Sequence, residues 1–275
     1  MFNLNALFHP ITAQPFRGDT VMHASCPPCA ALAPFVACFW GTLSPTTQES
    51  AAEYEPSLIV PDACVDLIFV IDHTSGAVDC SFGSFNDRAT RAFFIRARAG
   101  LSRFAIRFPF WTVRRFTNVP LNAAVSDPDA YFPGWRAAFS VMLLEETSLV
   151  ARAAWAESFL LPRSDGHRES PDVMNALYHI LRTKGAAPVQ DVCAYAAVSA
   201  RQMERLFCVH IGAPPKRVAG LVRYQNLWMD LAQGTLTNVQ DAVDKYRYAD
   251  QAHLLHDFKK YHTVTPAQAI QIARS

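Results

Sequence analysis

The C-terminal part of this 275-residue chain repeats itself, and the repeat constrains the fold more than any other sequence feature. The tripeptide Val-Gln-Asp at 189–191 recurs at 239–241. Phe207 and Phe258 hold equivalent places, and each is followed eight residues later by a proline. A pattern that recurs after about fifty residues indicates two copies of one supersecondary unit.

The first copy has the anatomy of a helix-turn-helix. Residues 189–195 predict a short helix and 196–198 a turn, and Ser199 is a typical N-cap for a second helix that ends near Val209. The buried stripe of this second helix is expected at Met203, Leu206 and Phe207. Its outward positions are then polar: Arg201, Gln202, Glu204 and Arg205.

The second copy follows the same plan, with Asp250 as the cap and Leu254 and Phe258 in the core. Its outward positions are Gln251, Ala252 and His256. A long helix is predicted over 214–231, with Gly234 beyond its end. A rigid connector of this kind would hold two recognition helices at a fixed distance, which suits successive major-groove faces about 34 Å apart.

Residues 171–275 resemble the DNA-binding domain of AraC-type regulators, a bacterial family of transcription regulators. The stretches that carry the resemblance are VSARQMERLFCVHIGAPPKRVAGLVRYQ (198–225) and YADQAHLLHDFKKYHTVTPAQ (248–268). The N-terminal part more loosely resembles the sensor-like domain of one subgroup, through LAPFVACFW (32–40), PDACVDLIF (61–69), FGSFNDR (82–88) and AIRF (105–108).

The resemblance implies specific roles for side chains of both units. The residues expected to read bases are Arg201, Glu204 and Arg205 in the first unit and Gln251, Ala252 and His256 in the second. Their chemistry agrees, because arginine pairs with guanine, glutamine with adenine, and glutamate accepts from cytosine. The expected phosphate partners are Lys216, Arg217, Arg223, Lys259 and Lys260. Double-stranded DNA is thus the expected partner; RNA polymerase, a small-molecule effector and a second copy of the chain are further candidates.

The sequence also departs from the family pattern. Glycine is usual where this chain has Ala197, Arg247 and Thr263, since those turns favour a left-handed backbone. Val243 replaces a small residue, and His256 stands where arginine is common. These departures predict that the second unit reads DNA more weakly than the first, or serves as a scaffold.

The N-terminal part predicts strands and then helices, so the expected class is α+β: a small β-barrel or sandwich with helices, followed by an all-α double helix-turn-helix domain. Strands are expected over 64–71, with a turn at 72–76, over 93–98 and over 103–108. In the last of these, Arg103 and Arg107 are expected on a solvent-facing side.

Helices are expected over about 133–161, and the polar stretch 163–170 marks the boundary between an N-terminal sensor or dimerisation domain (1–165) and the DNA-binding domain (166–275). Ser170 and Pro171 are typical of a helix start just after that boundary.

The charge distribution agrees with this division. Residues 171–275 hold 12 lysines and arginines against 8 aspartates and glutamates, a net charge of +4, and residues 1–170 hold 13 against 16, a net charge of −3. A basic half beside an acidic half favours a nucleic-acid-facing domain and a second domain with another task. With neither a membrane-spanning stretch nor a signal peptide in the sequence, a cytoplasmic protein is expected.

The seven cysteines form no disulfide pattern. Cys26 and Cys29 have the spacing of a zinc-binding or dithiol motif. If the motif binds zinc, Cys38 and Cys64 would be the two further zinc ligands. This leaves two alternatives to the regulator hypothesis: a thiol- or metal-responsive regulator, and a scaffold protein with degenerate DNA binding. No phosphate-cradling loop, serine elbow or paired-histidine motif is present in the sequence, so neither an enzyme nor a cofactor is expected.

Overall fold

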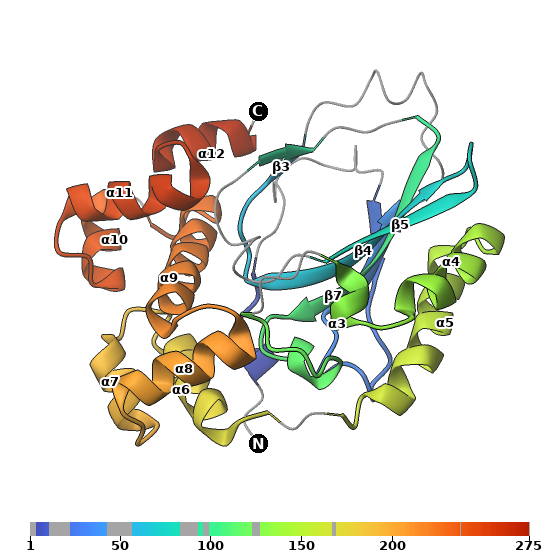
Figure 1. Ribbon diagram of the computed structural model, residues 1–275. Coiled ribbons are helices and arrows are strands. Elements are labelled where there is room, and N and C mark those ends of the chain that lie inside the picture. Colours follow the sequence, from blue (N-terminus) through green and yellow to red (C-terminus); the bar gives the residue numbers. More distant parts are fainter. Residues whose placement is uncertain are drawn as a thin grey trace.

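The computed structural model describes residues 4–10, 23–42, 57–82, 93–95, 99–122, 127–166, 169–236 and 238–274. An antiparallel sheet with flanking helices forms the N-terminal part, and the C-terminal part is helical (Figure 1). The predicted α+β class is therefore confirmed.

Five strands form the main sheet, in the order β1-β2-β7-β4-β5, and all neighbours are antiparallel. They are β1 (His23–Cys26), β2 (Cys38–Thr42), β7 (Leu101–Pro109), β4 (Cys64–Asp72) and β5 (Ala77–Phe82). A second sheet pairs β3 (Ser57–Ile59) with β6 (Phe93–Ile95). The strands expected over 64–71 and 103–108 are thus β4 and β7, and the predicted turn joins β4 to β5. Of the strand expected over 93–98, residues 96–98 lie outside the described part.

One face of the main sheet packs against two helices, α4 (Trp135–Glu145) and α5 (Leu149–Leu160). The alternation predicted for β7 explains this, because Phe104, Ile106 and Phe108 are fully buried. On α4, Phe139 stacks on the sheet residue Phe69, with ring centroids 4.6 Å apart. The helical stretch expected over 133–161 is these two helices. The short elements are η1 (Leu4–Ala6), η2 (Val113–Arg115), α3 (Pro128–Tyr131) and η3 (Leu161–Arg163).

The other face of the sheet corrects one sequence expectation. Arg107 does not face open solvent: its side chain is only 13% exposed and forms an ion pair with Asp62, while Asp66 lies 3.9 Å away. Burial lowers the pKa of Arg107 to about 10. A guanidinium enclosed in this way requires carboxylate partners, which the two aspartates supply.

Seven helices follow in the C-terminal part: α6 (Pro171–Arg182), α7 (Val189–Tyr195), α8 (Ala200–Ile211), α9 (Pro215–Ala232), α10 (Val239–Tyr246), α11 (Gln251–His262) and α12 (Pro266–Arg274). Helix α9 lies between the α7–α8 pair and the α10–α11 pair (Figure 1). It is buried on several sides, by contacts with α6, α8, α10, α11 and α12. Within the described ranges, no helix is both long and apolar enough to cross a membrane.

Among the described residues, several contacts join the two parts of the chain, including those between η1 and α6. Arg115 pairs with Glu169 at 3.0 Å, which fixes the segment leading into α6. The Leu121 N–H donates to the Val209 carbonyl of α8 at 3.1 Å. On α9, the fully buried Gln225 donates its amide to the carbonyl of Pro61. Both the recognition helix and the connector therefore touch the N-terminal part directly.

Candidate nucleic-acid interface

The first helix-turn-helix unit consists of α7 and α8, which begin and end close to the predicted residues. Ser199 is the N-cap of α8, and its hydroxyl accepts from the Gln202 N–H at 3.3 Å. Met203 and Phe207 are fully buried, whereas Leu206 is half-buried. Burial of one stripe fixes the rotation of α8, so its opposite side is presented to solvent.

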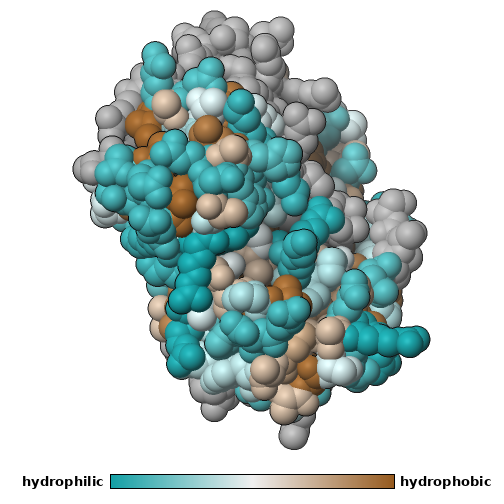
Figure 2. Space-filling view, turned by 90° about the vertical axis from the view of Figure 1, so that its left-hand side faces the viewer, coloured by the Kyte–Doolittle hydropathy of each residue, from teal (hydrophilic) through white to brown (hydrophobic). Residues whose placement is uncertain are grey.

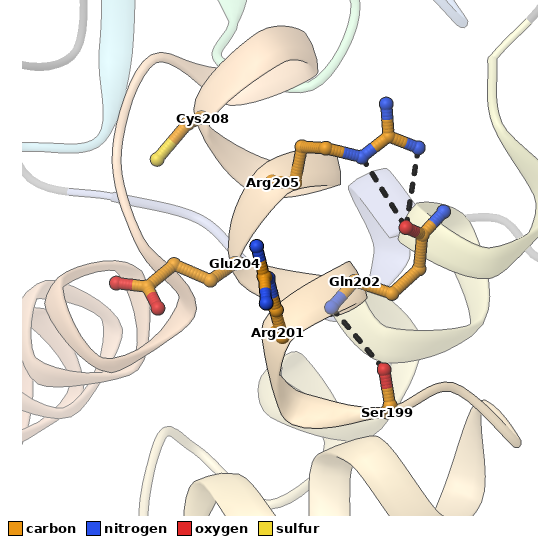
Figure 3. A pocket seen from close by; sticks show the side chains of 6 residues that line it. All are labelled: Ser199, Arg201, Gln202, Glu204, Arg205 and Cys208. Atoms are coloured by element: carbon orange, nitrogen blue, oxygen red, sulfur yellow. Dashed lines mark hydrogen bonds between the residues drawn. The ribbon is translucent and has the colours of Figure 1, made fainter.

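The exposed side of α8 carries a shallow recess (Figure 3). It is lined by Ser199, Arg201, Gln202, Glu204, Arg205 and Cys208. Nε and Nη2 of Arg205 donate to the Gln202 side-chain carbonyl at 3.2 and 3.1 Å, and Glu204 extends away from this pair. Gln202 thus orients the Arg205 guanidinium, a positioning role that the sequence analysis did not assign.

The second unit consists of α10 and α11. Asn238 and Asp250 cap the two helices, with the Asp250 carboxylate accepting from the His253 N–H at 2.7 Å. Leu254 and Phe258 are buried as predicted. The outward residues Gln251, Ala252 and His256 are exposed, and Gln251 donates to the Gln240 side chain at 3.3 Å.

Three positions where glycine is usual in the family have the left-handed backbone that the sequence analysis expected. Their φ angles are +54° at Ala197, +52° at Arg247 and +69° at Thr263. Each residue follows a helix closely, where a left-handed residue ends the hydrogen-bonding pattern. The departures from glycine are therefore accommodated by backbone strain and not by a change of turn.

This strain predicts that Arg247→Gly stabilises the protein by up to about 1 kcal/mol, since glycine adopts positive φ without a Cβ clash. The midpoint of urea unfolding, followed by circular dichroism, measures the effect. Lys245→Gly is the control: that residue lies within α10, where glycine should cost about 1 kcal/mol, and the variant also loses the ion pair of Lys245 with Asp230. A lower midpoint for Arg247→Gly would show that the turn is not strained.

Helix α9 is braced against the second unit by Arg223. Its guanidinium pairs with Asp257 of α11 at 2.8 Å and lies 4.1 Å from the Tyr248 ring centroid. The Arg223 side chain is 17% exposed. Arg223 therefore differs from the other expected phosphate partners, because its guanidinium is already occupied within the protein.

The remaining expected phosphate partners are more accessible. Lys216, Lys259 and Lys260 are exposed, and Arg217 is half-exposed with a partner within the protein. The side of the molecule on which α7, α10 and α11 lie in Figure 1 faces the viewer in Figure 2, where it is mostly hydrophilic with small apolar patches. The exposed lysines are the groups that suit a phosphate backbone.

A buried histidine lies beneath the second unit, in a place the sequence analysis did not single out. His262 is 1% exposed, and its Nδ1 lies 2.8 Å from the Tyr224 hydroxyl. Its ring is 5.0 Å from that of Phe258 and 4.6 Å from that of Trp228. Burial lowers the pKa of His262 from its ordinary value of 6.5 to about 4. The ring is therefore neutral near pH 7 and acts as a core residue.

The cysteine pair of the N-terminal part does not form a metal centre within the described residues. Cys26 and Cys29 are free and half-buried, and the Cys29 N–H donates to the Glu157 carboxylate. Burial, and after it the charge of Glu157, raises the pKa of the Cys26 thiol. A raised pKa disfavours the thiolate that metal binding and redox exchange need.

Two capped helix-turn-helix units on one connecting helix, with polar recognition helices facing solvent, define a class: DNA-binding proteins. Residues 192–271 match a family described as a helix-turn-helix domain, and residues 24–126 match one described as a domain of unknown function (DUF6597). The chain therefore carries a helix-turn-helix domain of the AraC type at its C-terminal end, which makes it a DNA-binding transcription regulator.

Similar solved structures include two of ToxT from Vibrio cholerae. An apo single-substitution variant is 8% identical, with a TM-score of 0.39, and another crystal form is 9% identical, with a TM-score of 0.37. Each alignment covers 76% of this chain and 89% of the ToxT chain. The likeness is distant. A search of curated proteins found no match.

Proposed function

We propose that the protein recognises a specific duplex sequence mainly through α8. The observation that carries this proposal is the recess on α8, where Arg201 and Arg205 are exposed while Met203 and Phe207 on the opposite side are fully buried. Arginine held by a neighbouring side chain is suited to bidentate contact with guanine, and Glu204 would accept from cytosine.

The second unit contributes less to base reading in this proposal. Gln251 is exposed and could pair with adenine, and Ala252 offers a methyl group to thymine. His256 is exposed where the family usually has arginine, so it makes fewer contacts. Lys216, Arg217, Lys259 and Lys260 bind phosphates and position the domain. Arg223 instead keeps α9 and α11 in a fixed relation.

The N-terminal domain, residues 1–165, controls the DNA-binding domain, residues 166–275, in response to an effector. The route is the pair of contacts that reach α8 through Val209 and α9 through Gln225. An effector acts only if it favours one arrangement of these contacts over another. RNA polymerase is the expected downstream partner. The thiol-responsive alternative is less favoured, because the pKa of Cys26 is raised.

Arg205→Ala tests base reading. We expect binding to a selected site to weaken by about 1–3 kcal/mol, mostly as lost discrimination at one base pair. A mobility-shift titration against the selected site and single-base variants measures both effects. Equal affinity of Arg205→Ala and the wild type for the selected site would count against the proposal.

Lys216→Ala is the matched control, because an exposed phosphate partner carries no sequence information. It should weaken binding to all sequences alike and reduce the salt dependence by about one counterion. A wild-type affinity that does not respond to salt would favour the scaffold alternative.

A further inference from the structure

The turn between α10 and α11 holds an arginine at a position where glycine is usual in the family. Arg247 has the left-handed backbone described above, with a φ of +52°, and it is exposed. Its side chain forms no ion pair and no hydrogen bond with any residue that the structure describes. Arg247 therefore bears the cost of a left-handed conformation without a partner inside the protein to offset it. Strain that is retained in this way is typical of residues that serve function.

The equivalent turn of the first unit provides an internal comparison. Ala197 has almost the same φ, +54°, and is also exposed, but its side chain is a methyl group. The strain alone therefore does not distinguish the two units, whereas the positive charge does. Of the three turns in which glycine is usual in the family, only the turn before α11 carries a cation at that position.

Two buried tyrosines hold the backbone on either side of Arg247. The Tyr246 hydroxyl donates to the carboxylate of Asp230 on α9, and the Tyr248 hydroxyl donates to the carboxylate of Asp257 on α11 at 3.2 Å. The turn is thus tied to two other helices. Because the backbone of Arg247 is already fixed, a partner that binds its guanidinium orders only the side chain.

The turn lies where a duplex would approach the second unit. Arg247 precedes Asp250, the N-cap of α11, by three residues, and the N-terminal end of a recognition helix is the end that contacts base edges in the major groove. In Figure 1, α8 and α11 both begin on the side of the molecule away from the main sheet, and the turn between α10 and α11 lies at that same edge. A cation on this turn is therefore placed beside the phosphates that border the groove.

The opposite end of α11 is also basic. Lys259 and Lys260 lie in its last turn and are exposed. Helix α11 has 12 residues and is therefore about 18 Å long, whereas the major groove is about 12 Å wide. Cations at the two ends of the helix can thus reach phosphates on both sides of the groove. Between these ends, the residues expected to face bases include neither arginine nor lysine.

We infer that Arg247 binds a DNA phosphate at the start of α11, and that the second unit holds the DNA backbone independently of sequence while α8 reads the bases. A guanidinium suits this role because its planar donors can bind two phosphate oxygens at once. The inference rests on the proposed DNA-binding function, to which it adds a binding residue and different roles for the two units.

Arg247→Gly in the full chain tests the inference, because it should change stability and DNA binding in opposite directions. The free energy of unfolding should rise, as predicted above, whereas the affinity for DNA should fall by about fivefold to tenfold at about 0.1 M salt. The loss should be the same for a selected site and for an unrelated duplex of equal length, since a phosphate contact carries no sequence information. The slope of log K against log salt concentration should become shallower by about 0.9, the value for one lost phosphate contact. Mobility-shift titrations over a series of salt concentrations measure all of these quantities.

Ala197→Gly is the matched control, because it relieves the same strain in the first unit without removing a charge. It should leave both the affinity for DNA and the salt slope at their wild-type values. Arg247→Lys keeps the positive charge at the second turn, so it should retain the salt slope of the wild type.

Arg205→Ala in the same titrations distinguishes a failure of this inference from a failure of the proposed function. If Arg205→Ala loses sequence discrimination while Arg247→Gly binds both duplexes with wild-type affinity and slope, α8 reads DNA and the inference about Arg247 is wrong. If the loss in Arg247→Gly is confined to one base pair of the selected site, Arg247 reads a base, and the phosphate role is wrong. A wild type without salt-dependent binding would overturn the proposed function and this inference together.

Discussion

Replacing Gly185 by alanine is expected to destabilise the helix-turn-helix domain by about 2–4 kcal/mol. Gly185 follows α6 with a φ of +73°, which costs an L-residue about 1 kcal/mol. A Cβ there would lie 2.2 Å from the Ala219 carbonyl oxygen and 2.6 Å from the Arg223 nitrogen, both in the backbone of α9. Backbone atoms cannot rotate away, so α6 and α9 must separate, at a further cost of about 1–3 kcal/mol.

Gly234→Ala separates the cost of the left-handed backbone from the cost of the steric clash. Gly234 has a similar φ of +70°, but nothing lies within 4 Å of the place its Cβ would take. The free energy of unfolding of Gly234→Ala should therefore fall by only about 1 kcal/mol. Urea unfolding of the full chain, followed by circular dichroism, gives both values. Equal losses in the two variants would mean that α6 and α9 are not in close contact at Gly185.

Acidification is expected to remove about 3 kcal/mol of stability through His262. The pKa of this residue is about 4 in the folded protein against 6.5 ordinarily, so the unfolded chain binds the proton more readily. The stability that the neutral ring contributes is present above pH 6.5 and is lost progressively as the pH falls toward about 4. Below that value both states are protonated, and this residue causes no further change.

The measurement is the free energy of unfolding of the wild type and of His262→Gln across that pH range. The variant should be less stable near pH 7, because the amide fills the aromatic site poorly, but its stability should depend less on pH. His256→Gln, at an exposed position on the same helix, should keep the pH dependence of the wild type. Parallel curves for the wild type and His262→Gln would show that the buried ring does not titrate in this way.

The C-terminal part was predictable because its signals are local. The apolar stripe of α8, the cap at Ser199 and the repeat of the same pattern fifty residues later each depend on neighbours within a few positions. The left-handed backbone at Arg247 was also expected, since a helix end demands it whatever residue is present. Local sequence patterns of this kind predict the folded structure because the tertiary contacts favour the same conformation.

The pairings that hold the molecule together were not predictable in this way. Arg223 and Asp257 are 34 residues apart, and Gln225 reaches Pro61 across 164 residues. Arg107 is a further example. Its alternation with the buried residues of β7 placed it on the opposite face of the sheet, but it gave no sign of the aspartates that lie on that face. Two residues distant in sequence carry no signal of their approach.

The amino-acid sequence by itself determined the class, the helix-turn-helix repeat and the outward residues of α8, because helix periodicity and capping are properties of short segments. Only the tertiary structure decided which charges remain available to a partner. Arg205 is exposed and oriented by Gln202, whereas the guanidinium of Arg223 already pairs with Asp257 and lies over the ring of Tyr248. The physical reason is that a charge acts through its surroundings, and these are assembled from distant parts of the chain.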